Sequence, residues 1–70
     1  MNIPELRAEM ARQKITIPKL AELIHMNKSN LYPRMRGETP FNQKDIANIA
    51  KALNLSNDKI LEIFFAEEVA

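Results

Sequence analysis

The chain has 70 residues, which is enough for one domain with a small core. Hydrophobic residues make up 46% of it and glycine occurs once, so the composition favours a compact helical bundle over a disordered chain. There is no cysteine, which excludes disulfide frameworks and thiolate metal sites. No apolar run reaches the length of a membrane span and no signal-peptide pattern opens the chain. We therefore expect a cytoplasmic protein with no membrane partner.

The formal net charge is only +1, but the charged residues are distributed unevenly. The middle of the chain carries six positive residues and one negative: Arg12, Lys14, Lys19, Glu22, Lys28, Arg34 and Arg36. The end carries one positive and four negative: Asp58, Lys59, Glu62, Glu67 and Glu68. A basic middle can approach the phosphates of a nucleic acid while an acidic end points away. Ordinary solvated helix surface explains the charges equally well.

The first predicted helix begins at a cap and a proline. Asn2 is expected to cap it, with Pro4 in the opening turn. Glu5 stands three residues after the cap, where its side chain completes a capping box. The helix is expected to fade near Gln13.

The second predicted helix follows the same pattern. Thr16 is expected to cap it, Pro18 lies in its first turn, and it runs to about Ile24. His25 follows at a turn position that favours a positive φ, which histidine tolerates better than most residues. Ala21 is small enough to let another helix cross closely, and the inner face is marked by Leu20, Ala21 and Ile24.

A third helix is expected to start after Asn27, which can cap it, and to end near Arg36, where Gly37 closes it. Leu31 and Met35 are four residues apart and mark its inner face. Two short helices joined by a tight turn, over about residues 17–36, are typical of a DNA-binding helix-turn-helix. In that motif the second helix enters the major groove.

Two further helices complete the predicted fold. Asn42 is expected to cap the fourth and Asn54 to close it, and its amphipathic stripe consists of Ile46, Ile49, Ala50 and Leu53. Ser56 is expected to cap the fifth, with Asp58 in its first turn. No strand pattern, repeat or linker is present. Residues 1–70 are therefore expected to form one all-α domain, a compact five-helix bundle.

The fifth helix carries more apolar surface than one face can hold. One stripe consists of Ile60, Ile63 and Phe64, and a second consists of Leu61, Phe65 and Val69. The second stripe predicts a homodimer interface, since monomers rarely expose such a patch. The alternative is a helix wrapped deeply by its own small core.

Taken together, these segments resemble the phage repressor and Cro type of helix-turn-helix, the XRE family, whose fold is that of a lambda-repressor-like domain. The likeness covers most of the chain and is closest to small phage-encoded members from Gram-positive hosts. It is carried by Leu20-Ala21-Glu22, Asn27-Lys28-Ser29-Asn30-Leu31-Tyr32, Arg34-Met35-Arg36-Gly37-Glu38 and Ile46-Ala47-x-Ile49-Ala50-x-Ala52-Leu53-x-Leu55-Ser56.

This resemblance implies a sequence-specific transcriptional regulator that binds a double-stranded operator, often as a dimer. Its base-reading positions fall on Lys28, Ser29, Asn30 and Tyr32. Cations and a hydroxyl near the end of the third helix suit phosphate contacts. These are Arg34, Arg36, Thr39 and Lys44. No cofactor, metal or small-molecule ligand is expected.

Two features depart from the family pattern. Relatives commonly carry a glutamine near the start of the second helix, where this chain has Ile17-Pro18, so the phosphate contact passes to Lys19. Pro33 lies inside the third helix and removes a backbone bond to Ser29. We therefore expect this helix to bend, or to end early near Tyr32.

Two other classes of function were weighed. An enzyme is not expected, because the one histidine, His25, lies in a turn and no glycine-rich phosphate loop is present. The stronger rival is a protein-interaction module, such as a phage antirepressor that binds a repressor instead of DNA. Pro33, the missing glutamine and the low net charge favour it, and the basic middle disfavours it.

Overall fold

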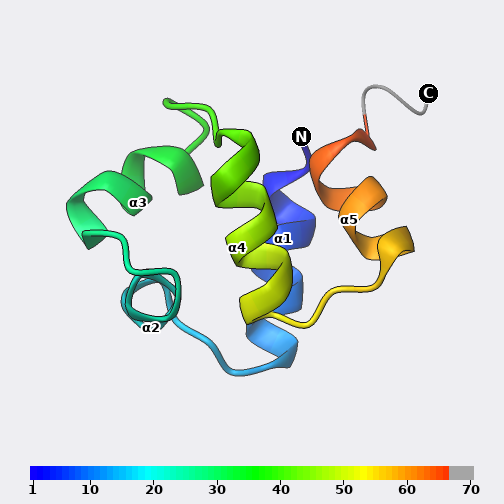
Figure 1. Ribbon diagram of the computed structural model, residues 1–70, viewed down its shortest axis with the longest axis horizontal. Coiled ribbons are helices and arrows are strands. Elements are labelled where there is room, and N and C mark those ends of the chain that lie inside the picture. Colours follow the sequence, from blue (N-terminus) through cyan, green and yellow to red (C-terminus); the bar gives the residue numbers. More distant parts are fainter. Residues whose placement is uncertain (67–70) are drawn as a thin grey trace.

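The computed structural model describes residues 1–66, and five helices lie within them. They are α1 (Ile3–Arg12), α2 (Ile17–Leu23), α3 (Lys28–Met35), α4 (Gln43–Ala52) and α5 (Asn57–Phe64). Figure 1 shows α1 behind α4, with α5 on one side of this pair and α2 and α3 on the other. The predicted all-α five-helix bundle is confirmed. No helix in the described range is long and apolar enough to cross a lipid bilayer.

Every helix contributes to one hydrophobic core. Its fully buried side chains are Leu6, Leu20, Leu31, Met35, Ile49, Leu53 and Ile63. Phe41, in the loop before α4, packs edge-to-face on Phe64 of α5, with ring centroids 6.2 Å apart. Because the core takes side chains from α3 as well as from α1, α4 and α5, the inner face of α3 is fixed by the same packing that stabilises the domain.

Side-chain caps open four of the described helices as the sequence predicts. Acceptor oxygens of Asn2, Thr16, Asn42 and Ser56 each take a hydrogen bond from the backbone N–H three residues on. The capping box predicted at Glu5 does not form. The N–H of Asn2 donates to the Ile63 carbonyl of α5 at 2.6 Å, and the Glu5 carboxylate accepts from Lys59 and Arg12. The Ile63 carbonyl thus accepts the N–H that the capping box would have used, and two cations bind the Glu5 carboxylate instead.

Within residues 1–66, α1 to α4 all end in the same hydrogen-bonded turn. One residue past each cap adopts a positive φ: Lys14 (58°), His25 (57°), Gly37 (79°) and Asn54 (52°). The next N–H bonds back to a carbonyl in the last turn, as in Ile15 to Met10 at 2.8 Å and Leu55 to Ala50 at 2.9 Å. The positive φ predicted for His25 and the closures at Gly37 and Asn54 are confirmed, whereas Lys14 was not anticipated.

Replacing Lys14 by glycine is expected to stabilise the domain by about 0.5–1 kcal/mol, because lysine pays a steric cost at φ 58° that glycine avoids. The gain is the difference between that relief and the larger backbone entropy that glycine loses on folding. Urea unfolding measures it. Lys51→Gly, in the last turn of α4, is the control and should destabilise. If Lys14→Gly has a lower unfolding free energy than the wild type, Lys14 is not strained at its positive φ.

Ion pairs on the surface fasten α5 to α1. Lys59 lies 2.9 Å from Glu5 and 3.2 Å from Glu62, and Arg12 bridges Glu5 at 3.1 Å and Glu9 at 2.8 Å. Hydrogen bonds from Lys59 and then Arg12 lower the pKa of Glu5 from its ordinary value of 4.5. Glu5 therefore couples the position of α5 to the pH of the solution.

The Glu5 carboxylate is expected to make the domain acid-sensitive. Its lowered pKa means that the folded protein binds this proton less readily than the unfolded chain. The stabilisation is full well above pH 4.5 and is lost as the pH falls through the lowered pKa. In Glu5→Gln, thermal midpoints should depend less steeply on pH in this acid range. Glu22→Gln, whose partner Lys19 lies within α2, is the control and should keep the wild-type slope.

Candidate nucleic-acid interface

The turn between α2 and α3 sets the two helices at a steep angle. In Figure 1 α2 is seen end-on while α3 runs across the view. The N–H of Met26 donates to the Ala21 carbonyl at 2.9 Å, and His25 supplies the positive φ that reverses the chain. Ala21 is 3% exposed and belongs to the core, as predicted for the inner face of α2. This arrangement is the predicted helix-turn-helix.

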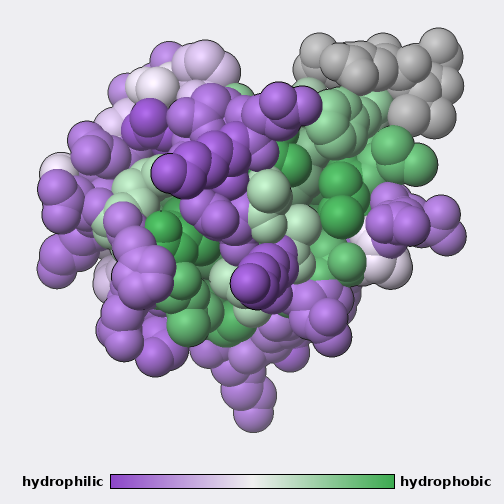
Figure 2. All heavy atoms as spheres, viewed as in Figure 1, coloured by the Kyte–Doolittle hydropathy of each residue, from purple (hydrophilic) through white to green (hydrophobic). Residues whose placement is uncertain are grey.

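One face of α3 is buried and the opposite face is open to solvent. Leu31 and Met35 are fully buried, whereas the predicted base-reading side chains are all exposed. Those are Lys28, Ser29, Asn30 and Tyr32. Figure 2 shows hydrophilic residues covering this end of the molecule, while hydrophobic residues reach the surface over α5 and between α2 and α4. The outer face of α3 is thus a polar, accessible helix surface.

The amino-terminal end of α3 lacks the side-chain cap that the sequence predicts. Asn27 has the extended backbone of a cap residue, but within residues 1–66 its side chain makes no capping hydrogen bond. Its carbonyl instead accepts from the N–H groups of Asn30 and Leu31. Without this side-chain cap, backbone donors of the first turn of α3 remain available to an anion.

The predicted early end of α3 at Tyr32 is wrong, because the helix continues through Pro33 to Met35. Proline removes one hydrogen bond, to Ser29, but contacts beyond the helix hold its last turn. The N–H groups of Glu38 and Gly37 bond back to Pro33 and Arg34 at 3.0 and 3.1 Å. These bonds offset the one that is lost.

A second support for the end of α3 comes from α1. Nη2 of Arg7 donates to the Met35 carbonyl at 3.1 Å, a cation at the negative end of the helix dipole. Sequence reasoning missed Arg7. Nothing in the local pattern around it marks a partner 28 positions away.

The residues predicted to contact phosphate differ in their exposure and in whether they already form ion pairs within the described part of the chain. Lys44 is exposed and forms no ion pair within the described part of the chain, and Thr39 is half-buried. Lys19 lies 3.4 Å from Glu22, and Arg36 bonds Glu38, whose pKa it lowers. Both of these pairs are exposed, so solvent and salt screen them and a phosphate can compete for the cation.

Arg34 stands apart from the other phosphate candidates. Its side chain is 22% exposed, its Nε lies 3.4 Å from Oδ2 of Asp45, and its Nη1 donates to the Asn30 carbonyl at 2.6 Å. Asp45 is buried and was not among the predicted site residues. The spacing Asn42-x-x-Asp45 could have flagged it as half of a capping box, which the structure contains in full.

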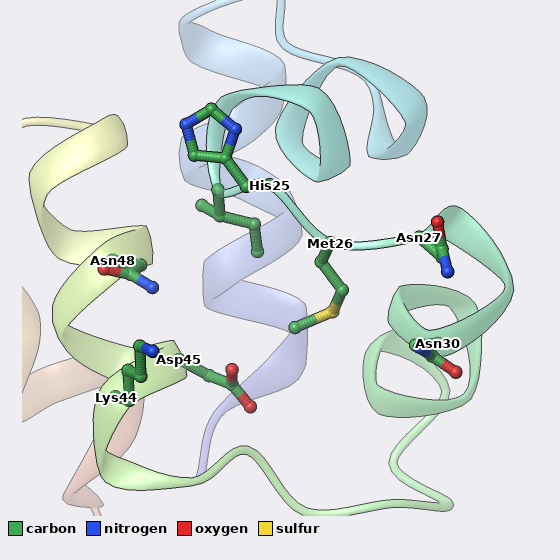
Figure 3. Close-up of a pocket in the computed structure, with 8 residues that line it drawn as sticks. His25, Met26, Asn27, Asn30, Lys44, Asp45 and Asn48 are labelled. Carbon is green, nitrogen blue, oxygen red and sulfur yellow. The ribbon is translucent and has the colours of Figure 1, made fainter.

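A groove of about 600 Å³ separates the start of α3 from α4. Figure 3 shows Asn27 and Asn30 on one wall, Lys44, Asp45 and Asn48 on the other, and Met26 between them. Hydrogen-bond donors dominate this lining, and its one carboxylate is already paired with Arg34. Within residues 1–66 no group of three or more histidine or acidic side chains is placed to hold a metal ion.

Comparison with known proteins identifies the family. A family model described as a BetR domain matches residues 5–69, which is nearly the whole chain. The chain belongs to the BetR domain family. No curated protein and no solved structure matched it. In this BetR domain the match covers α1 from Glu5 onward and the other four described helices in full, so the helix-turn-helix lies within the family region.

Proposed function

We propose that this BetR domain is a sequence-specific DNA-binding transcriptional regulator that reads operator DNA through α3. The observation that carries the proposal is the exposed polar face of α3, on a helix whose inner face is buried through Leu31 and Met35. An α-helix presented in this way fits the major groove of B-DNA.

The side chains divide between reading bases and holding the backbone. Lys28 can donate to guanine O6 and N7, while Ser29, Asn30 and Tyr32 can contact base edges or phosphates beside it. Lys19, Arg36, Thr39 and Lys44 flank α3 and suit phosphates, which fix register without reading sequence. Lys44 lies across the groove in Figure 3 from Asn27 and Asn30, on the wall that α4 forms.

Binding to DNA is tested by selecting duplexes from a randomised pool and titrating the selected duplex by fluorescence anisotropy. Three to four phosphates per protomer correspond to a slope of log K against log salt of about −3 to −4. A selected sequence with this slope supports the proposal. Absence of binding at low salt, or equal affinity for every duplex, contradicts it.

The second candidate function is a protein-interaction module, such as an antirepressor. One observation favours it: three of the five predicted phosphate contacts are already paired with carboxylates of this chain, namely Lys19, Arg34 and Arg36. Such a module would keep the helix-turn-helix while binding a repressor. The duplex selection separates the two functions, because a protein-interaction module returns no enriched sequence.

The proposed regulator is also expected to form a two-fold dimer through α5. Leu61 is 48% exposed, Phe65 is partly buried against the core, and Val69 lies outside the described residues. Such a dimer can place two recognition helices about 34 Å apart, one turn of DNA, and so predicts a palindromic operator.

Leu61→Glu is expected to shift the domain to monomer without unfolding it, because it puts two buried charges at the centre of the interface. Sedimentation velocity at high micromolar concentration measures the change. Leu23→Glu alters the other leucine that the described residues expose, at 40%, and serves as the matched control. A wild-type protein that sediments as a monomer at that concentration rules the dimer out.

A further inference from the structure

We propose that Arg34 is a positioning residue: its pairing with Asp45 holds α3 in orientation against α4, and it does not contact a DNA phosphate. This inference rests on the proposed function, since it concerns how the reading helix is held. It replaces the phosphate role that the sequence assigns to Arg34.

The guanidinium spans the two helices. Within α3, Nη1 of Arg34 donates a hydrogen bond to the Asn30 carbonyl at 2.6 Å. On α4 it faces Oδ2 of Asp45 at 3.4 Å. The same Oδ2 accepts from the N–H of Asn42 at 3.2 Å, and Asn42 in turn caps α4. One carboxylate therefore connects the start of α4 to the middle of α3.

The link acts together with the core: Leu31 and Met35 bury the inner face of α3, and the Arg34–Asp45 pair joins its last turn to the first turn of α4. The groove of about 600 Å³ lies beside this link, with Asn27 and Asn30 on one side and Lys44 and Asn48 on the other (Figure 3). Ile24 and Met26 also line the groove, but the residues that α3 and α4 themselves contribute to it are polar, so it adds little apolar packing between these two helices. Asn30, a proposed base reader, is the residue whose carbonyl Arg34 holds.

The energetics of the pair also indicate a role in geometry. Nε of Arg34 is buried and has no hydrogen-bond partner among the described residues, so the ion pair is incompletely satisfied. Ion pairs of this kind add little net stability, since the cost of removing both charges from water offsets their attraction. Two apolar side chains of similar volume would stabilise the domain equally well, but they would not fix the orientation of α3 relative to α4.

A phosphate contact that used Nε or Nη1 of Arg34 would require breaking one of these two links. A guanidinium that turned fully towards a phosphate would leave the Asp45 carboxylate, whose side chain is 11% exposed, without its cation. Arg36 has no such constraint, because its partner Glu38 has a side chain 60% exposed. Arg36 is therefore the matched comparison for a true phosphate contact.

The test measures affinity and salt slope on the duplex that the wild type selects from a randomised pool, with Arg34→Met, Asp45→Asn, their combination and Arg36→Met. We expect each of the first two to weaken binding about three- to tenfold with the slope unchanged, and the combination to be no weaker than either alone. Arg36→Met should lower the slope by about 0.9. A reduced slope in Arg34→Met, or tighter binding by Asp45→Asn, overturns the inference.

Two additions keep the result decisive. If Asp45→Asn is unfolded by circular dichroism, Arg34→Lys replaces it. A phosphate contact predicts near wild-type affinity for that variant, and a positioning role predicts the same loss as Arg34→Met. The second addition needs no DNA: in NMR spectra Asp45→Asn, or Arg34→Lys in its place, should shift the amide signals of Asn27 and Asn30 while methyl signals of Leu6 and Ile63 stay in place. Unchanged amide signals overturn the positioning role even if DNA binding holds. If no duplex is selected, the proposed function fails and these spectra still decide the role of Arg34.

Discussion

Replacing Leu31 by alanine is expected to cost about 2–5 kcal/mol of unfolding free energy, most of what a domain of this size holds. Leu31 is fully buried on the inner face of α3 and belongs to the single core cluster. Removing its branched end leaves a cavity that neighbours from several helices cannot fill without moving apart. Most of the protein should then be unfolded at 37 °C, and DNA binding should fall with it.

The neighbouring Tyr32 provides the matched control. It lies on the same helix but is 37% exposed, so Tyr32→Ala should keep nearly wild-type stability while lowering affinity for the selected duplex. Urea unfolding followed by circular dichroism separates the two variants. A Leu31→Ala protein within 1 kcal/mol of wild type would mean that α3 is not held by this core.

Helix boundaries could be predicted from the sequence because they depend on local chemistry. Thr16, Asn42 and Ser56 cap their helices through bonds to a backbone N–H only three residues away, which a short sequence pattern can specify. His25 and Asn54 adopt the positive φ expected of them for the same reason. At Lys14 local chemistry gave no signal, since lysine does not favour that conformation and the turn at the end of α1 imposes it.

Two of the errors, at Glu5 and at Pro33, occur where a distant partner competes with the local one. Glu5 has the spacing of a capping box, but Lys59 of α5 takes its carboxylate. Pro33 does not end α3, because Arg7 and the turn at Gly37 hold the helix beyond it. Neither partner can be identified until the fold has brought the segments together.

The candidate site shows the same division between features that local sequence determines and features that distant partners determine. Exposure of Lys28 and Ser29 follows from the helical period, so it could be read from the sequence. The free or paired state of a cation depends on what lies across from it. Lys44 and Arg34 look alike as phosphate candidates in the sequence, yet Lys44 faces an open groove and Arg34 faces Asp45. Charge patterns locate a basic surface but do not show which of its charges remain available.

Lys28→Ala is expected to weaken binding to the selected duplex by about 1–3 kcal/mol, roughly 5- to 150-fold, and to relax sequence preference at one base pair. Lys28 is the first residue of α3, is exposed, and forms no ion pair with any residue from 1 to 66, so its ammonium is available for a guanine edge. Since an alanine at this exposed position favours the helix, folding should not be harmed.

The experiment compares Lys28→Ala with Lys51→Ala, which removes the same charge from an exposed position in the last turn of α4. Affinity for the selected duplex and for single-base variants of it is measured by anisotropy at one salt concentration. We expect Lys51→Ala to lower the affinity for all duplexes slightly and alike, through the general field. Lys28→Ala should lose most affinity for the selected duplex and least for the variant at the contacted base pair. If both proteins lose the same affinity on every duplex, Lys28 contributes charge alone and base reading must lie with Ser29, Asn30 or Tyr32.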